Sequence, residues 1–371
     1  MTDPALRVTY LVRASAEEIE ARAESLMLEQ TVELPRAAVR DQLVVDRVVG
    51  SVEAIEPDRG EGFRVTIAQP IATAAADPAQ LLNVLFGNSS LQSDVVLEDV
   101  DLPGEAFDWL PGPRAGIAGL RALTGVPSRP LLATALKPMG FGIDRLATLC
   151  LGFARAGVDI VKDDHGLANH PFAPFEARVE ACLRAVAIAA RDTGRQALYV
   201  PNLIGTPDRI AAQLAFAREA GARAVMLSPM LVGLPLLHQL ASAADGLPIF
   251  AHPSLGGVLR AREAALFGKL FRWYGADAVI FPHSGGRFGY GTDVCRDLAA
   301  ALRAEHPRAR PAFPVPAGGI KVEGVTDLLS FYGHDCILLI GGSLYEAGDS
   351  LFERTRGLVD QVARTFEEPA V

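Results

Sequence analysis

The sequence has few cysteines: four among 371 residues, far apart and without C-x-x-C spacing. A zinc ribbon or a disulfide framework needs closer pairs. Cys150, Cys182, Cys295 and Cys336 are therefore predicted to be buried thiols in a reducing compartment. An apolar leader is missing at the N-terminus, and polar residues interrupt every apolar run before it could span a bilayer. The sequence predicts a cytoplasmic protein with no membrane segment.

Clustered positive charge is missing as well. The formal net charge is −9 at pH 7, and no basic run is interleaved with aromatic side chains, so a nucleic-acid surface is not expected. Apolar residues make up 50% of the chain and charged residues 21%, which is typical of a globular protein with a large core. The length is enough for two domains, or for one barrel with an attachment.

The first part of the chain, residues 1–112, has the pattern of a small α+β domain of the ferredoxin-like type. Two helices are predicted from their N-terminal signals, a capping box at Ser15–Glu18 and an N-cap at Asp77 before a proline. Strands are predicted from apolar alternation at residues 6–12, 48–55 and 62–68. A Pro- and Gly-rich linker at 107–113 predicts the domain boundary near residue 112.

Beyond this boundary, residues 113–371 repeat one unit, a short apolar strand followed by an alanine- and leucine-rich helical stretch. Eight repeats are the number in a (β/α)8 TIM barrel. A doubly wound open sheet is the alternative, but no G-x-G-x-x-G follows the first strand, which favours the barrel. The strands are predicted at residues 132–136, 158–162, 198–202, 224–228, 248–251, 278–281, 312–316 and 337–340.

Chemically active side chains gather at the carboxyl ends of these strands, where barrel active sites lie. The second strand ends in four consecutive ionisable residues, Lys162 to His165, which packing does not explain. A structural ion pair that caps the strand is the alternative. The other strand ends contribute Lys137, Asn202, His252, His283 with Ser284 and Arg287, the pair Gly318–Gly319 and the pair Gly341–Gly342.

The acids and lysines suit metal-assisted proton transfer. Asp164 and His165 could hold a divalent metal, with Lys162 or Asp163 as a further ligand. Lys162 could serve as an oxygen ligand if carbamylated, and otherwise as a base or a cationic partner of the acids. Lys137 is a second candidate proton carrier, and its alternative role is an exposed charge on the barrel rim. Such a site would form an enediolate, an intermediate that decarboxylation shares.

The two glycine pairs and two histidines suit the binding of a phosphorylated substrate. Gly318–Gly319 and Gly341–Gly342 would let backbone N–H groups approach a phosphate after the last two strands. Ordinary glycine turns are the alternative. His252 and His283 could donate hydrogen bonds to hydroxyl or phosphate oxygens.

These motifs resemble the large subunit of ribulose-bisphosphate carboxylase (RuBisCO). The resemblance rests on the order and strand placement of Thr134–Pro138, Val161–Asp164, His283–Gly285 and the two glycine pairs. It covers nearly the whole chain, because Glu29–Thr31 and Gly87–Asn88 look like the family's N-terminal active-site segments. It implies a homodimer or a dimer-based oligomer, in which Glu29 and Asn88 of one subunit complete the barrel site of its neighbour.

The chain departs from true carboxylases at the metal site. There the ligands are a carbamylated lysine, an aspartate and a glutamate. Lys162 and Asp164 match the first two, but His165 stands where the glutamate belongs. A mixed nitrogen and oxygen site leaves open both the carbamylation of Lys162 and the choice between Mg²⁺ and another divalent metal.

Two further departures argue against CO2 fixation. Tyr290 stands where the mobile loop of a carboxylase carries its lysine, and Pro253 stands where a phosphate-binding arginine is expected. Without the lysine, productive carboxylation is not expected. Without the arginine, one phosphate is expected in place of two.

The pattern is similar to that of RuBisCO-like proteins, the non-carboxylating form IV branch. The resemblance implies metal-assisted enolisation of a phosphorylated keto sugar, with isomerisation of 5-methylthioribulose 1-phosphate slightly favoured. Alternatives are enolisation of a diketo methylthio sugar phosphate, and decarboxylation or hydrolysis of 3-oxo-isoapionate or its 4-phosphate. An inactive regulator or scaffold that keeps the barrel is the remaining alternative.

The roles that the resemblance implies are specific to residues of this sequence. Lys162, Asp164 and His165 would bind the metal, Lys137 would be the general acid and base, and His283 and His252 would hold substrate oxygens. Arg287 could pair with a substrate carboxylate, and Met139 with Phe288 could receive a methylthio group. Phosphate would bind at Gly318, Gly319, Gly341 and Gly342, with Glu29 and Asn88 supplied by the partner subunit.

Overall fold

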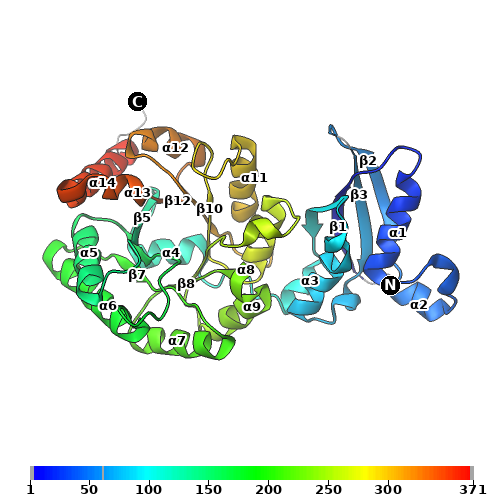
Figure 1. The fold of residues 1–371 in the computed structure, drawn as a ribbon, viewed down its shortest axis with the longest axis horizontal. Helices are drawn as coiled ribbons and strands as arrows, with labels where there is room; N and C mark the ends of the chain where they lie inside the picture. The colour runs from blue at the N-terminus through cyan, green and yellow to red at the C-terminus, as the bar shows by residue number, and fades with distance from the viewer. Residues whose placement is uncertain (1–3, 61, 368–371) are drawn as a thin grey trace. The chain divides into compact units, whose positions relative to one another are not determined.

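The computed structural model describes residues 4–60 and 62–367 (Figure 1). The chain forms two compact units. The smaller unit comprises Met1–Pro111 together with Leu255–Leu270, and the larger comprises Gly112–Ser254 and Phe271–Val371. The prediction of two contiguous domains, 1–112 and 113–371, did not include the return of Leu255–Leu270 to the smaller unit.

The smaller unit contains an antiparallel sheet in the order β2-β3-β1-β4. Its strands are β1 (Ala5–Val12), β2 (Ser51–Pro57), β3 (Phe63–Pro70) and β4 (Val95–Asp101). Every second residue of β1 is fully buried, as expected for a strand with one face on the core: Leu6, Val8, Tyr10 and Val12. The first three strands confirm the prediction, whereas β4 was not predicted.

A segment from the inserted Leu255–Leu270 extends this sheet beyond β4. The amide of Leu97 donates to the carbonyl of Arg260 at 2.9 Å, and the amide of Arg262 donates to the carbonyl of Leu97 at 2.8 Å, in parallel pairing. The insertion continues as a π-helix at Ala264–Leu270. It thus covers an edge of the sheet that would otherwise present unpaired backbone groups.

The described residues of the smaller unit form the α-helices α1 (Ile19–Thr31), α2 (Gln42–Arg47) and α3 (Pro78–Phe86). Asp77 caps α3 as predicted, because its Oδ1 accepts hydrogen bonds from the amides of Ala79 and Gln80, both at 2.8 Å. The predicted helix after Ser15 is α1, whereas α2 was not predicted.

The larger unit is the predicted barrel. Parallel pairing joins β12-β5-β6-β7 in one arc and β11-β10-β9-β8 in the other, and a parallel bridge between Asn202 and Met226 links the two arcs. The strands are β5 (Leu131–Leu136), β6 (Ile160–Asp163), β7 (Leu198–Val200), β8 (Val225–Leu227), β9 (Ile249–Ala251), β10 (Ala278–Pro282), β11 (Phe313–Ala317) and β12 (Ile337–Leu339). All eight predicted strands are confirmed.

Helices surround these strands, as Figure 1 shows for α5, α6 and α7. The α-helices of this unit are α4 (Gly116–Thr124), α5 (Ile143–Arg155), α6 (Phe175–Thr193), α7 (Pro207–Glu219), α8 (Pro229–Val232), α9 (Leu234–Ala243), α10 (Phe271–Trp273), α11 (Thr292–Arg303), α12 (Val325–Tyr332), α13 (Gly342–Tyr345) and α14 (Leu351–Glu367). Short 3₁₀ turns in the two units lie at Arg36–Ala38, Ile71–Ala74, Asn88–Leu91, Gly104–Asp108, Gly256–Val258, Val322–Gly324 and Gly348–Ser350.

The barrel interior is filled by one face of each strand. Its buried side chains include Ala133, Ile160, Val200, Met226, Phe250, Ile280, Val315 and Leu339. Because side chains alternate along a strand, residues two positions further along share this inward face. The four cysteines are buried and free, which confirms the prediction of buried thiols. In the described part of the chain, no helix is both long enough and apolar enough to cross a membrane.

Candidate active site

The central contact of the site joins the ends of β5 and β6. The Nζ of Lys137 lies 2.6 Å from Oδ1 of Asp164. The hydroxyl of Tyr345 fixes the backbone beside Lys137, since it accepts from the Lys137 amide at 3.0 Å and donates to the Ala135 carbonyl at 2.9 Å. Lys137 is thus paired with an acid at the barrel mouth.

Lys162 follows Ile160 on the inward face of β6 and is only 3% exposed. Its Nζ donates to the carbonyl of Asp163 at 2.8 Å. Burial lowers the pKa of Lys162 to about 8, and the positive charge of Lys137 also lowers it, whereas Asp164 and Asp163 act in the opposite direction. With this pKa, roughly one tenth of the amine is uncharged at pH 7, and the uncharged amine is the form that reacts with carbon dioxide.

Asp163 lies on the opposite face of β6 and is fully buried. Its Oδ1 accepts from the hydroxyl of Tyr199 at 2.7 Å, and its Oδ2 accepts from Arg178 Nε and from the Asn202 amide, both at 3.1 Å. Both carboxylate oxygens are thus engaged with protein groups. The sequence left open whether Lys162 or Asp163 is the further metal ligand. Lys162 lies on the same side of the strand as Asp164, whereas Asp163 lies on the opposite face.

The next two residues extend the site toward β9. His165 Nδ1 lies 3.5 Å from Asp164 Oδ1, and the His165 ring stacks on the ring of His252 at 4.2 Å between centroids. Burial would raise the pKa of Asp164, but hydrogen bonds from His165 and Lys137 outweigh burial and hold that pKa well below its usual value. Asp164 is therefore a carboxylate at neutral pH.

The donor atoms fit a divalent metal only if Lys162 is modified. Among the described residues, no group of three or more His, Cys, Asp and Glu is placed to hold a metal ion. Asp164 and His165 supply two donors, and the ammonium of Lys162 cannot be a third. A carbamate on Lys162 would supply the missing oxygen, and the buried, partly uncharged amine is suited to form one.

The end of β10 faces the first glycine pair. The amide of His283 donates to the carbonyl of Ala317 at 2.9 Å, and burial lowers the pKa of the His283 ring. The ring lies beside the backbone of Gly319, but its two nitrogens are buried without a close hydrogen-bond partner among the described groups. A buried imidazole with open donor and acceptor positions is suited to hold a substrate oxygen.

The loop after β10 packs directly on Gly318 and Gly319. The amide of Arg287 donates to the carbonyl of Gly318 at 2.9 Å. A Cβ at Gly318 would come within 2.8 Å of the Phe288 ring, and one at Gly319 within 3.1 Å of the Arg287 side chain. The absence of a side chain at the two glycines therefore lets this loop pack against their backbone. The same absence would also let a phosphate approach that backbone.

The second glycine pair lies beside Lys137, since β12 is paired with β5. A Cβ at Gly341 would come within 3.8 Å of Lys137 Cε, whereas one at Gly342 would meet open space. The ends of β5, β6, β9 and β12 thus bring together Lys137, Lys162, Asp164, His165, His252 and Gly341.

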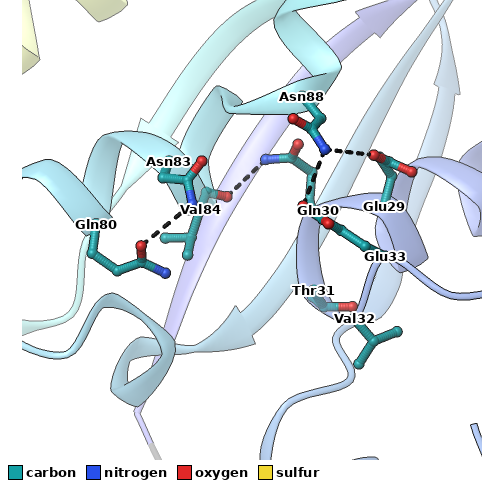
Figure 2. A pocket seen from close by; sticks show the side chains of 9 residues that line it. All are labelled: Glu29, Gln30, Thr31, Val32, Glu33, Gln80, Asn83, Val84 and Asn88. Carbon is teal, nitrogen blue, oxygen red and sulfur yellow. Dashed lines mark hydrogen bonds between the residues drawn. The ribbon is translucent and has the colours of Figure 1, made fainter.

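Glu29 and Asn88 lie together in the smaller unit. Figure 2 shows the Asn88 amide between two carboxylates, donating to Glu29 Oε1 at 3.1 Å and to Glu33 Oε1 at 3.0 Å. They line a small cavity of about 190 Å³. Glu33 was not predicted as part of this group; it lies just beyond the end of α1 with a positive φ of 52°.

A larger cavity of about 580 Å³ opens in the barrel unit, lined by residues that precede its strands, including Arg129, Val158 and Gln196. It contains none of the predicted site residues. Because barrel active sites lie where the strands end, this cavity is not a candidate for the reaction centre.

Sequence reasoning missed the residues that support the site. Arg178, Tyr199 and Tyr345 were not singled out, and Asn202 was noted only for its place at a strand end. One signal was available: Arg178 follows Phe175 by three positions and precedes Cys182 by four, which places it on the apolar, inward stripe of a helix. A charged residue on such a stripe needs a buried partner.

Comparison with known proteins gives a consistent result. The sequence model of the ribulose bisphosphate carboxylase large chain, catalytic domain, matches residues 116–293. The chain is 49% identical over 356 residues to ribulose bisphosphate carboxylase-like protein 1 of Rhodopseudomonas palustris, which covers 96% of this chain and 97% of the relative.

A second relative carries a specific activity in its name. The chain is 46% identical over 365 residues to 5-methylthioribulose-1-phosphate isomerase of Rhodospirillum rubrum, covering 98% of this chain and 97% of the relative. The crystal structure of a Rubisco-like protein from Rhodopseudomonas palustris superposes with a TM-score of 0.92 at 42% sequence identity, covering 99% of this chain and 100% of that one.

Proposed function

The chain belongs to the RuBisCO large-chain family, among its RuBisCO-like members, and we propose that it is a metal-dependent isomerase of 5-methylthioribulose 1-phosphate. The proposal is supported by near full-length similarity to the Rhodospirillum rubrum isomerase. The observation that carries it is the 2.6 Å contact between Lys137 and Asp164 beside the buried Lys162. This cluster combines a proton carrier with candidate metal ligands.

Lys137 is the proton carrier in this proposal. Its Nζ removes the proton from the hydroxyl-bearing carbon next to the substrate carbonyl and returns it to the former carbonyl carbon. The hydroxyl proton passes to the former carbonyl oxygen, so that the carbonyl moves along the sugar without a net change in atoms. The acidic neighbour Asp164 holds the amine at the barrel mouth. An amine that both takes and gives a proton suits a 1,2-type rearrangement through an enediolate.

Asp164, His165 and a carbamylated Lys162 would hold Mg²⁺ or another divalent metal. Such a metal polarises the substrate carbonyl and so acidifies the adjacent C–H bond. Arg178 and Tyr199 leave Asp163 no free oxygen, so the ligand set does not extend to that residue.

The remaining residues would bind the substrate. His283 and His252 hold hydroxyl or carbonyl oxygens, and the glycine pairs at the ends of β11 and β12 hold the phosphate. A second copy of the chain would complete the site with Glu29 and Asn88, so a homodimer is the smallest active form. Met139 and Phe288, 56% and 58% exposed, would receive the methylthio group.

A second candidate function is decarboxylation of 3-oxo-isoapionate 4-phosphate. The observation that favours it is Arg287, whose guanidinium lies 5.4 Å over the Phe288 ring and forms no ion pair with a described carboxylate. A guanidinium in this position could bind a substrate carboxylate in a bidentate manner.

Proton NMR with Mg²⁺ in D2O tests the proposal, with the two substrates in parallel. Incorporation of deuterium into 5-methylthioribulose 1-phosphate, together with a rearranged ketose phosphate, is the expected result. Loss of the carboxyl carbon from 3-oxo-isoapionate 4-phosphate would favour the second candidate. Absence of both reactions would favour a catalytically inactive regulator.

A further inference from the structure

The loop that carries Asp164 and His165 has no helix or strand of its own. It runs through residues 164–174, from the end of β6 to the start of α6. A catalytic or metal site requires its side chains to be held within about 0.5 Å of the productive geometry. Beyond the hydrogen bonds within the loop, its main chain therefore needs support from groups outside it.

Asn202, at the end of β7, makes that connection. Its Nδ2 donates to the carbonyl of His165 at 3.0 Å and to the carbonyl of Leu167 at 3.1 Å. Its backbone amide donates to Oδ2 of Asp163 at 3.1 Å. A single residue thus contacts both sides of the segment 164–166, and the turn is closed by the Leu167 amide, which donates to the Asp164 carbonyl at 2.9 Å.

Asn202 is itself held by the neighbouring strand. It forms a parallel bridge with Met226. The amide of Met226 donates to the Pro201 carbonyl at 2.9 Å, and the amide of Leu203 donates to the Met226 carbonyl at 2.7 Å. The barrel wall therefore fixes the backbone on both sides of Asn202.

Packing alone does not explain an asparagine at this position. Asn202 is 1% exposed, and its Oδ1 is buried with no hydrogen-bond partner among the described groups. A buried acceptor without a partner destabilises a fold. Within the described residues, the Asn202 side chain makes its hydrogen bonds only through Nδ2, to the two carbonyls of the loop.

We propose that Asn202 is a positioning residue, whose amide fixes the main chain of the loop so that Asp164 and His165 meet the metal in the correct geometry. This inference rests on the metal site of the proposed function. Arg178 supports the far end of the same loop, since its Nη1 donates to the carbonyls of Ala168 and Ala173 at 2.9 and 2.6 Å. Of these two side chains, that of Asn202 bonds to the main chain of a candidate ligand, His165, and that of Arg178 does not.

The test compares Asn202→Ala with Gln213→Ala in the full-length protein. Gln213 is a buried amide of the same kind, but it fixes the neighbouring loop: its Oε1 accepts from the Ile204 amide at 3.0 Å and its Nε2 donates to the Ile204 carbonyl at 3.2 Å. Two quantities are measured: Mn²⁺ affinity, from the electron paramagnetic resonance signal of the free ion, and hydrogen–deuterium exchange by mass spectrometry.

Asn202→Ala should weaken Mn²⁺ binding by about 10- to 100-fold, as loss of a group that orients a ligand does. It should also speed exchange in residues 164–174. Gln213→Ala should leave Mn²⁺ affinity within about twofold and speed exchange only around residues 203–206. If Asn202→Ala does not fold, Asn202→Ser, which keeps one donor, should show an intermediate loss of affinity.

Equal losses of Mn²⁺ affinity in the two alanine variants would overturn the inference, because they would indicate a general loss of stability. Unchanged exchange in residues 164–174 would overturn it as well. If the wild-type protein does not bind Mn²⁺, the metal site of the proposed function fails, while the exchange measurement still decides whether Asn202 holds the loop.

Discussion

His165 and His252 stack almost face to face, with their ring planes 13° apart and their centroids 4.2 Å apart. Burial lowers the pKa of His252 well below its usual value, and the positive charge of Lys162 lowers it further. His252 is therefore a neutral imidazole, and the two stacked rings do not both carry a positive charge. Its Nδ1 is paired with the Ser254 hydroxyl at 2.8 Å, which leaves Nε2 for a ligand.

Replacing His165 by glutamate should change the metal preference. His165→Glu converts a mixed donor set into an all-oxygen one, so affinity for Mg²⁺ should rise relative to Zn²⁺ by about tenfold. Isothermal titration calorimetry of both metals measures the ratio. His170→Glu is the control, because His170 lies on the same loop with its Nε2 beside the Gly166 carbonyl at 3.0 Å. An equal change in both variants would contradict a ligand role for His165.

Removing the side chain of Lys137 should abolish proton transfer. Lys137→Ala should lower kcat for isomerisation and the rate of deuterium incorporation by roughly 10²- to 10⁴-fold. Lys269→Ala is a matched control, because Lys269 Nζ also lies 2.6 Å from an aspartate, Asp99, but in the smaller unit. Similar losses in both variants would show that the pair at Lys137 is structural.

Phe288 should matter for the methylthio group and not for the phosphate. Phe288→Ala should lower kcat/KM for 5-methylthioribulose 1-phosphate by about tenfold, because an apolar group loses its contact. The same variant should change kcat/KM for 5-deoxyribulose 1-phosphate, which lacks the methylthio group, much less. Phe366→Ala, at the cavity before the strands, serves as the control. Equal effects on the two substrates would remove Phe288 from the specificity site.

Arg272 should be a major source of stability. It is 2% exposed and its guanidinium donates to main-chain carbonyls at 2.7 to 2.9 Å. The acceptors are Ala301, Ala304, Ala309 and Arg310. Arg272→Met should lower the free energy of unfolding in urea by about 3 kcal/mol or more, since it leaves buried carbonyls without donors. Arg218→Met, at a surface pair with Asp245, should cost less than about 1 kcal/mol.

Asp277 should make stability depend on pH. Burial raises its pKa to about 6, although its carboxylate accepts from the amides of Ala115, Gly116 and Ile249. An aspartate in the unfolded chain has a pKa of about 3.9. Between about pH 4 and pH 6 the folded protein keeps a proton that the unfolded chain has released. The contribution of Asp277 to the free energy of unfolding should therefore fall by roughly 3 kcal/mol as pH rises through this window.

The measurement for Asp277 is urea unfolding of the wild type and Asp277→Asn between pH 4 and pH 7. Carboxylates with lowered pKa values, such as Asp164, contribute to the pH dependence of the free energy of unfolding with the opposite sign. These contributions are the same in both proteins, so they cancel when the two free energies are subtracted. The advantage of the wild type over the variant should shrink as pH rises. A constant or growing advantage would contradict the raised pKa.

The architecture and the reactive residues were predictable because both follow local patterns. Eight buried strands have short apolar runs, and barrel chemistry concentrates where strands end. Two of the chain's four lysines, Lys137 and Lys162, lie in the candidate site. The alternation of side chains along a strand could also have decided between Lys162 and Asp163 as the further ligand, a choice that the prediction left open.

The supporting contacts were not predictable from such patterns. Asn202 and Arg178 act on a loop that is adjacent to them only because β6, β7 and α6 pack together, and no spacing in the sequence encodes that proximity. β4 was missed because Glu98, Asp99 and Asp101 interrupt its apolar alternation. These acids have a tertiary role instead: Glu98 pairs with Arg262 at 2.7 Å and Asp99 with Lys269 at 2.6 Å.

Those two ion pairs have a consequence for chimeric proteins. The smaller unit takes its edge segment, Leu255–Leu270, from the middle of the barrel sequence. A recombinant exchange of residues 1–111 with a relative would separate Glu98 and Asp99 from the basic residues that evolved beside them. The smaller unit thus cannot be exchanged through its N-terminal part alone. A chimera that keeps this unit intact must take Met1–Pro111 and Leu255–Leu270 from the same parent.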